Sequence, residues 1–80
     1  MNNLLDEVKI EIGNAISKFP PFHSMHEGYG VLLEEVDELW DWVKTKNEFR
    51  IKSKVHKECI QIAAMALRMI IDCEKDDYKK

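Results

Sequence analysis

The stretch from about Lys52 to Glu74 constrains this chain most, because as a helix it would be apolar over most of its circumference. With about 100° per residue, two apolar arcs follow one another without a polar break. The first arc holds Cys59, Ile62, Ala66, Met69 and Cys73, and the second holds Ile60, Ala63, Ala64, Leu67, Ile70 and Ile71. The remaining strip is polar except for one methionine, and holds Lys54, Lys57, Gln61, Met65, Arg68 and Asp72. A helix of this kind has to be covered on several sides, so it favours an all-α fold.

An N-terminal helix is predicted over about residues 3–18. Its apolar positions follow one another at spacings of three and four, and are Leu5, Val8, Ile12, Ala15 and Phe19. Pro20 and Pro21 end this helix, because proline lacks the backbone N–H and pushes its predecessor out of the α region.

A second helix is predicted over about residues 24–46, where Ser24 and Glu27 fit a capping box. Gly28 and Gly30 weaken its first turns and would move the start to Val31 if the box did not form. The third helix, at about 52–74, has two candidate N-caps, Asn47 and Ser53. No segment alternates with the period of a strand, so we expect a single all-α domain over residues 1–80.

The size of the chain adds a prediction about assembly. A chain of 80 residues is small, and one of this length buries only about 60% of its unfolded surface. Two partner helices from the same chain hardly cover the apolar arcs of the third. We therefore expect self-association into a bundle of the four-helix type, as a homodimer or homotetramer.

Charge and hydropathy exclude several classes of partner. The formal net charge is −3, and the one cationic cluster is local: it holds Arg50, Lys52, Lys54 and Lys57. Without a basic stripe, binding to a nucleic-acid polymer is not expected. No stretch reaches the length of apolar chain that a membrane span requires, and acidic residues interrupt the N-terminal apolar positions. We expect a soluble, cytoplasmic protein.

Two polar pairs at helical spacing of three suggest a metal site: Glu35 with Glu38, and Glu58 with Gln61. Each pair places its side chains on one helix face, at the edge of the apolar arc. Oxygen ligands from two helices are the coordination that Mg²⁺ or Mn²⁺ prefers. The alternative is a solvated face, with the glutamates serving only as good helix formers.

The runs from Tyr29 to Trp40 and from Lys57 to Arg68 resemble the MazG-like all-α nucleotide pyrophosphohydrolases, which are relatives of the dimeric dUTPases and the dCTP pyrophosphatases. The resemblance covers about residues 22–73. The motif of that family is Glu-x-x-Glu on one helix and Glu-x-x-Asp on the next. The resemblance implies a Mg²⁺ site at Glu35, Glu38 and Glu58, and a house-cleaning activity that converts a nucleoside triphosphate to its monophosphate and pyrophosphate.

Gln61 departs from the motif, because the family has Asp at that position. A neutral amide offers one carbonyl oxygen in place of a carboxylate, so it would be a weaker metal ligand. By the resemblance, Glu38 or its acidic neighbour Glu34 would accept the proton of the attacking water.

Four further residues are candidates for holding the nucleotide. Arg68 and Lys54 would bind phosphate, although a surface ion pair between Arg68 and Asp72 is the simpler explanation of that arginine. Trp42 and His26 would contact the base.

Two functions besides hydrolysis stay open at this stage. The chain would be a binding module that keeps metal or nucleotide affinity without turnover if Gln61 disables the cluster. It would be a structural dimerisation domain if the glutamates are merely solvated. Carboxylate pairs at the edge of the apolar arc on both helices favour the hydrolase and the binding module over the structural dimerisation domain.

Overall fold

All three expected helices are present in the computed structural model, which describes residues 2–45 and 48–78. Helix α1 spans Asn2–Lys18, α2 spans Met25–Val43 and α3 spans Glu48–Tyr78. The described residues contain no strand, which confirms the all-α class. Over these same ranges, none of the helices is both long enough and apolar enough to cross a bilayer.

The predicted capping box forms at the start of α2. Ser24 has extended backbone angles, with φ −157° and ψ 166°, and its hydroxyl oxygen accepts a hydrogen bond from the Glu27 N–H at 3.1 Å. The Glu27 carboxylate accepts in turn from the His23 N–H at 2.6 Å. The first bond pairs a backbone donor of the first turn, and the second, which goes to the residue before the N-cap in place of the N-cap itself, fixes the loop against the helix, so the helix begins at Met25 despite its glycines.

The other predicted boundaries shift by a few residues. Helix α3 begins at Glu48 rather than Lys52, and it continues to Tyr78. Ser53 therefore lies inside the helix and does not cap it, while Asn47 lies outside the described residues. Helix α2 ends at Val43, and the N–H of its C-cap Lys44 bonds to the Trp40 carbonyl.

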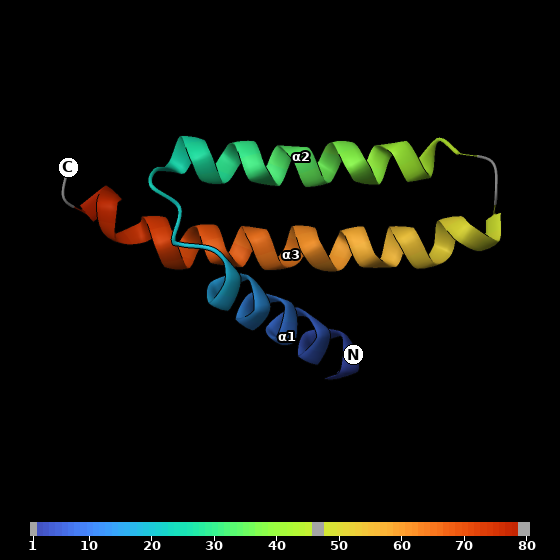
Figure 1. Ribbon diagram of the computed structural model, residues 1–80, viewed down its shortest axis with the longest axis horizontal. Coiled ribbons are helices and arrows are strands. Elements are labelled where there is room, and N and C mark those ends of the chain that lie inside the picture. Colours follow the sequence, from blue (N-terminus) through green and yellow to red (C-terminus); the bar gives the residue numbers. More distant parts are fainter. Residues whose placement is uncertain (1, 46–47, 79–80) are drawn as a thin grey trace.

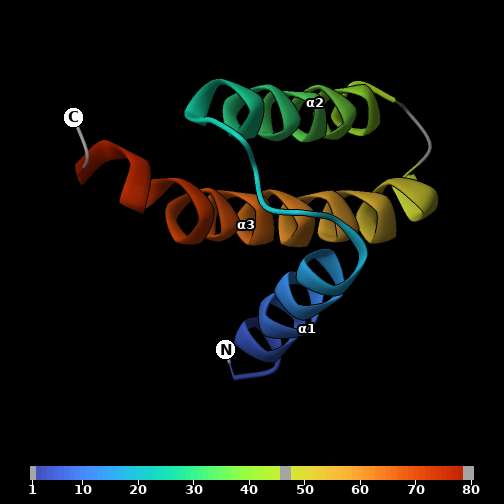
Figure 2. The ribbon, with the colours of Figure 1, turned by 60° about the vertical axis from the view of Figure 1, so that its left-hand side comes forward.

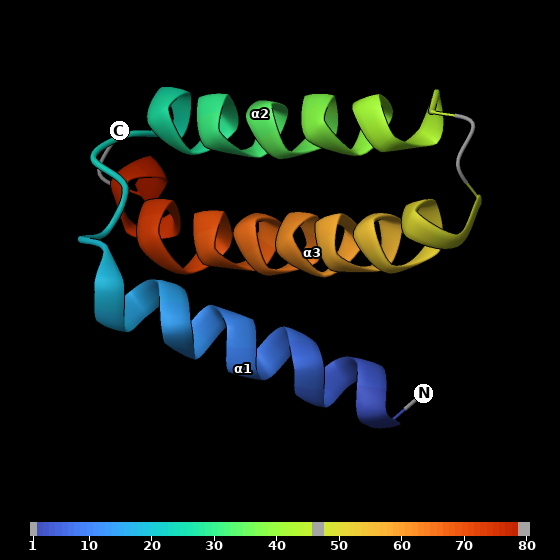
Figure 3. The same cartoon turned by 45° about the vertical axis from the view of Figure 1, so that its right-hand side comes forward.

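Helix α3 is the centre of the molecule, and the other two helices pack on different sides of it (Figure 1). Among the described residues, no Cα atom of α1 lies within 8 Å of one of α2, and a turned view separates the two helices on the two sides of α3 (Figure 2). Helix α2 runs antiparallel to α3. Helix α1 crosses α3 obliquely and runs in the same overall direction as α3 (Figure 3).

The small core lies where α1 packs on α3. Ala15, Ala64 and Met65 are buried, and five partly buried side chains pack around them: Val8, Ile12, Phe22, Val31 and Leu32. The burial of Met65 corrects the helical-wheel assignment, which placed this residue on the polar strip. Two of the expected core positions of α1 are instead exposed, Leu5 at 55% and Phe19 at 60%.

Arg68 holds the end of α1 and the proline loop, which is the segment 19–24 between α1 and α2, against α3. Its guanidinium donates to three backbone carbonyls, those of Ala15 (2.9 Å), Phe19 (2.7 Å) and Pro20 (2.6 Å). It also donates from Nε to the Asp72 carboxylate at 3.0 Å, and that carboxylate accepts the Phe22 N–H at 3.0 Å. Arg68 is only 2% exposed, so the part of the polar strip from Gln61 to Asp72 is an internal face covered by α1 and the loop after it, while Lys54 and Lys57 stay exposed.

Eight large apolar side chains stay exposed on the hairpin of α2 and α3. On α2 they are Tyr29, Leu33, Val36, Trp40 and Val43, and on α3 they are Leu67, Ile70 and Ile71. The α2 members recur at spacings of four and three, the period of a helix–helix seam. We call this set the open apolar face. No other part of the described chain covers this face. The exposed α3 members agree with the prediction that two partner helices hardly cover the apolar arcs of α3.

Candidate metal centre

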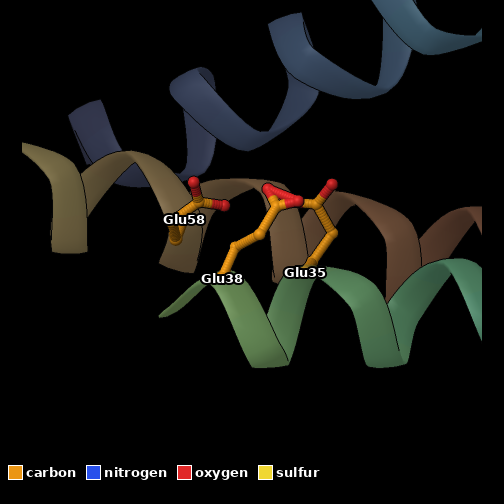
Figure 4. A group of neighbouring side chains, drawn as sticks. All are labelled: Glu35, Glu38 and Glu58. Carbon is orange, nitrogen blue, oxygen red and sulfur yellow. The ribbon is translucent and has the colours of Figure 1, made fainter. Parts of the chain in front are cut away.

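Three carboxylates meet at the seam between α2 and α3. Glu35 and Glu38 lie one turn apart on α2, and Glu58 reaches toward them from α3 (Figure 4). One oxygen atom from each of the three lies within 4.8 Å of the others. The helical spacing of three and the antiparallel packing of α2 on α3 bring together the residues that the sequence singles out.

The negative charges of the three carboxylates act on one another, and the effect is visible at Glu35. Burial raises the pKa of the half-buried Glu35 from 4.5 to about 7, with further contributions from a hydrogen bond with Glu58 and from the charges of Glu38, Glu58 and Glu34. Glu58 presents a buried oxygen, Oε1, with no hydrogen-bond partner among the described residues. Buried carboxylate oxygens are normally paired, so an unpaired one at the centre of an acidic group needs an explanation.

A proton or a divalent cation held between the carboxylates would balance this charge. Three carboxylates at mutual hydrogen-bonding or slightly longer separations repel one another unless a proton or a cation lies between them. An all-oxygen set suits Mg²⁺ or Mn²⁺ rather than a soft metal. In the part of the chain that the structure describes, this is the one group of three or more carboxylate, histidine or cysteine side chains close enough to share a metal ion.

Gln61 contacts a residue that sequence reasoning missed. Its amide Nε2 donates to the Glu11 carboxylate on α1 at 2.8 Å, and the two residues are 50 positions apart. Glu11 carried no signal in the sequence, because it lies on the expected polar side of an amphipathic helix. Only the register of α1 against α3 identifies it.

A cleft of about 670 Å³ opens between α1, the proline loop and the hairpin, and it reaches the group of three carboxylates at Glu35, while Glu38 and Glu58 are not among its lining residues. Glu11, Glu35 and Gln61 are among its polar lining residues, and its apolar walls include Phe22 and Met65. Small-molecule sites typically have volumes of about 300–1,000 Å³. The cleft therefore has room for a ligand of nucleotide size next to Glu35.

The remaining predicted residues are distributed unevenly around this centre. Glu34 is exposed and stays outside the group of three, although its charge acts on Glu35. Trp42 and Lys54 lie one turn beyond Glu38 and before Glu58, and the Lys54 ammonium lies 5.5 Å from the centre of the Trp42 ring. His26 is exposed in the first turn of α2, about 13 Å along the helix axis from Glu35.

Arg68 serves the fold. Four N–H groups of its guanidinium are taken by the three carbonyls and Asp72, so the ion pair weighed as its alternative is present. Its guanidinium is also 5.2 Å from the centre of the Phe22 ring. We therefore do not include Arg68 among the residues that would bind a phosphate.

Comparisons with models of known protein families, with curated proteins and with solved structures found no match to this chain.

Proposed function

We propose that this protein is a Mg²⁺-dependent nucleoside triphosphate pyrophosphohydrolase of the MazG-like type. The observation that carries the proposal is the meeting of Glu35, Glu38 and Glu58 within 4.8 Å, with a buried oxygen of Glu58 left unpaired. The match of these residues to the Glu-x-x-Glu and Glu-x-x motif positions, and the adjoining cleft, support it.

Each residue of the centre has a part in this proposal. Glu35, Glu38 and Glu58 would hold the cation, and the carbonyl oxygen of Gln61 would add a weaker ligand. When bound, the cation neutralises charge on phosphate oxygens and activates water. Glu38 is the exposed member of the three, and with its exposed neighbour Glu34 it is placed to accept a proton from water.

The substrate would lie across the open end of the seam and in the cleft. Trp42 and Lys54 are one helical turn from the carboxylates, so a flat ring and a cation are available near a nucleotide held there. A base would stack on the Trp42 ring, and the Lys54 ammonium would turn from that ring to a phosphate oxygen. His26 lies too far along α2 to reach the same phosphates, and would contact only a more distant part of the ligand.

We further propose that the functional unit is a homodimer or homotetramer formed through the open apolar face. Its eight large side chains, each at least 41% exposed, lie on both helices of the hairpin. A patch of this kind on a small protein usually marks an interaction surface. Packing two such hairpins together would produce a four-helix bundle.

The proposal is tested by incubating the protein with a panel of ribo- and deoxyribonucleoside triphosphates and Mg²⁺ or Mn²⁺, and by identifying the phosphorus products. We expect monophosphate and pyrophosphate, with no orthophosphate. Glu38→Gln should reduce turnover by about 100-fold or more. The control is Glu7→Gln, which removes an α1 carboxylate that pairs with His56 outside the centre.

Binding without turnover would favour the alternative of a non-catalytic metal- or nucleotide-binding module. Failure of Mn²⁺ to bind the wild-type protein would overturn the enzyme and the metal-binding form of this alternative.

A further inference from the structure

Glu11 and Gln61 form a direct link from α1 to the candidate metal centre. The Glu11 Oε2 atom accepts from the Gln61 Nε2 atom at 2.8 Å, and both side chains are partly buried. Both also line the cleft that Glu35 lines, one turn of α3 from Glu58. The contact therefore lies beside the three carboxylates and not on a remote surface.

The chemistry of the two groups fixes the orientation of the amide. An ionised carboxylate only accepts hydrogen bonds, whereas a glutamine amide has a donor end and an acceptor end. Glu11 therefore selects the NH₂ end of Gln61. The carbonyl oxygen is the amide atom that stays unbound to Glu11, and it is also the atom that a hard cation binds.

The same contact explains why a neutral residue is suited to position 61 in this chain. A carboxylate there would face the Glu11 carboxylate at hydrogen-bond distance with no proton between them, and the two charges would repel each other. With glutamine at this position, the fourth negative charge sits on α1, hydrogen-bonded to residue 61 and at the wall of the cleft that Glu35 also lines.

We infer that Glu11 is a positioning residue of the proposed metal centre, which acts by orienting the Gln61 amide and by supplying the fourth negative charge from α1. The inference rests on the proposed function. Hydrogen-bond partners of metal ligands typically change metal affinity by about 10- to 100-fold when they are removed.

The experiment measures Mn²⁺ affinity by calorimetric titration of the full chain at one fixed pH. Glu11→Gln keeps the shape of the side chain and removes its charge, and we expect about 10- to 100-fold weaker binding. The double variant Glu11→Gln/Gln61→Glu exchanges the two groups, so that the amide on α1 donates to a carboxylate on α3. It should regain most of the lost affinity.

Glu7→Gln is the matched control, since Glu7 lies one turn earlier on α1 and also contacts α3, through His56 at 2.7 Å. Its Mn²⁺ affinity should equal that of the wild type. Thermal melting without metal accompanies each titration. A variant that melts like the wild type yet binds Mn²⁺ more weakly has lost a property of the centre and not of the fold.

Two results would overturn the inference while leaving the proposed function intact. One is wild-type affinity in Glu11→Gln together with weakened binding in Glu38→Gln. The other is a double variant that melts like the wild type but stays as weak as Glu11→Gln. If the wild-type protein binds no Mn²⁺, the proposed function fails, and the role of Glu11 fails with it.

Discussion

At the scale of single residues, the fold keeps two charged side chains where water cannot fully solvate them. Arg68 is satisfied by the protein itself, through three carbonyls and Asp72. Glu35 is not, because its neighbours Glu38 and Glu58 are also acids. Arg68 is therefore expected to stabilise the fold. The effect of Glu35 on stability is expected to depend on whether a proton or a cation neutralises its charge.

The metal-free protein should lose stability as the pH rises from about 4.5 to about 7. The pKa of Glu35 is about 7 in the folded protein and 4.5 as its ordinary value, so the folded state binds a proton more tightly in this window. Its contribution is fully present below the lower value and is lost above the upper one. Urea denaturation with a chelator, at a series of pH values, measures this slope.

Glu35→Gln should lack that part of the slope and should be the more stable protein above pH 7. Adding Mg²⁺ above that pH should stabilise the wild type and not the variant. Equal pH dependence in the two proteins would show that Glu35 titrates normally.

Arg68→Met should be strongly destabilising, by about 3–5 kcal/mol, because it leaves a buried carboxylate and three carbonyls without their donor. Arg68→Lys should rescue only part of this loss, since one ammonium cannot reproduce the fork of a guanidinium. Chemical denaturation followed by circular dichroism gives both values. An Arg68→Met midpoint close to that of the wild type would mean that the buried contacts contribute little.

At the scale of the helices, the close approach of α2 to α3 depends on one glycine. A Cβ atom at Gly28 would lie 2.9 Å from the Met69 Cγ atom and 3.1 Å from the Phe22 Cδ2 atom. A Cβ atom at Gly30 would meet nothing within 4 Å. The two glycines of the same helix thus have different reasons to be there.

Gly30→Ala should raise the free energy of unfolding by about 0.5–1 kcal/mol, the usual gain from replacing glycine inside a helix. Gly28→Ala should fail to show this gain and should be net destabilising, because Met69 and Phe22 must move. Thermal denaturation of both variants side by side tests the difference. Equal stabilisation by both variants would mean that Met69 and Phe22 can move away from a Cβ atom at position 28 without a loss in the free energy of unfolding.

The helices and the three carboxylates are predictable from sequence, and the position of α1 is not. The period of apolar residues and the Ser24–Glu27 box depend on neighbours within a turn or two. The strip of α3 with Met65 and Arg68 looks solvent-facing until the arginine donors are matched to the carbonyls at the end of α1. That pairing depends on tertiary register, as does the bond between Glu11 and Gln61.

At the scale of the whole molecule, the open apolar face predicts assembly. The wild-type protein should sediment as a dimer or tetramer at micromolar concentration, well above the 9.4 kDa of a single chain. Trp40 belongs to this face and is 58% exposed, and Trp40→Glu should give a folded monomer. Ile10→Glu is the control, because Ile10 is 64% exposed on α1 and lies outside the face. A well-folded wild-type monomer would refute the prediction.

The attachment of α1 to α3 alone has a consequence for the order of folding. The bonds that hold α1 join residues 48 to 53 positions apart, whereas the α2–α3 hairpin closes from a short connection. Local closure costs less chain entropy, so the hairpin should form early and α1 should dock late. The reverse step, undocking of α1, is then the first opening of the native state. The three carboxylates would survive such an opening, since all of them belong to the hairpin, but the cleft and the support of Gln61 would not.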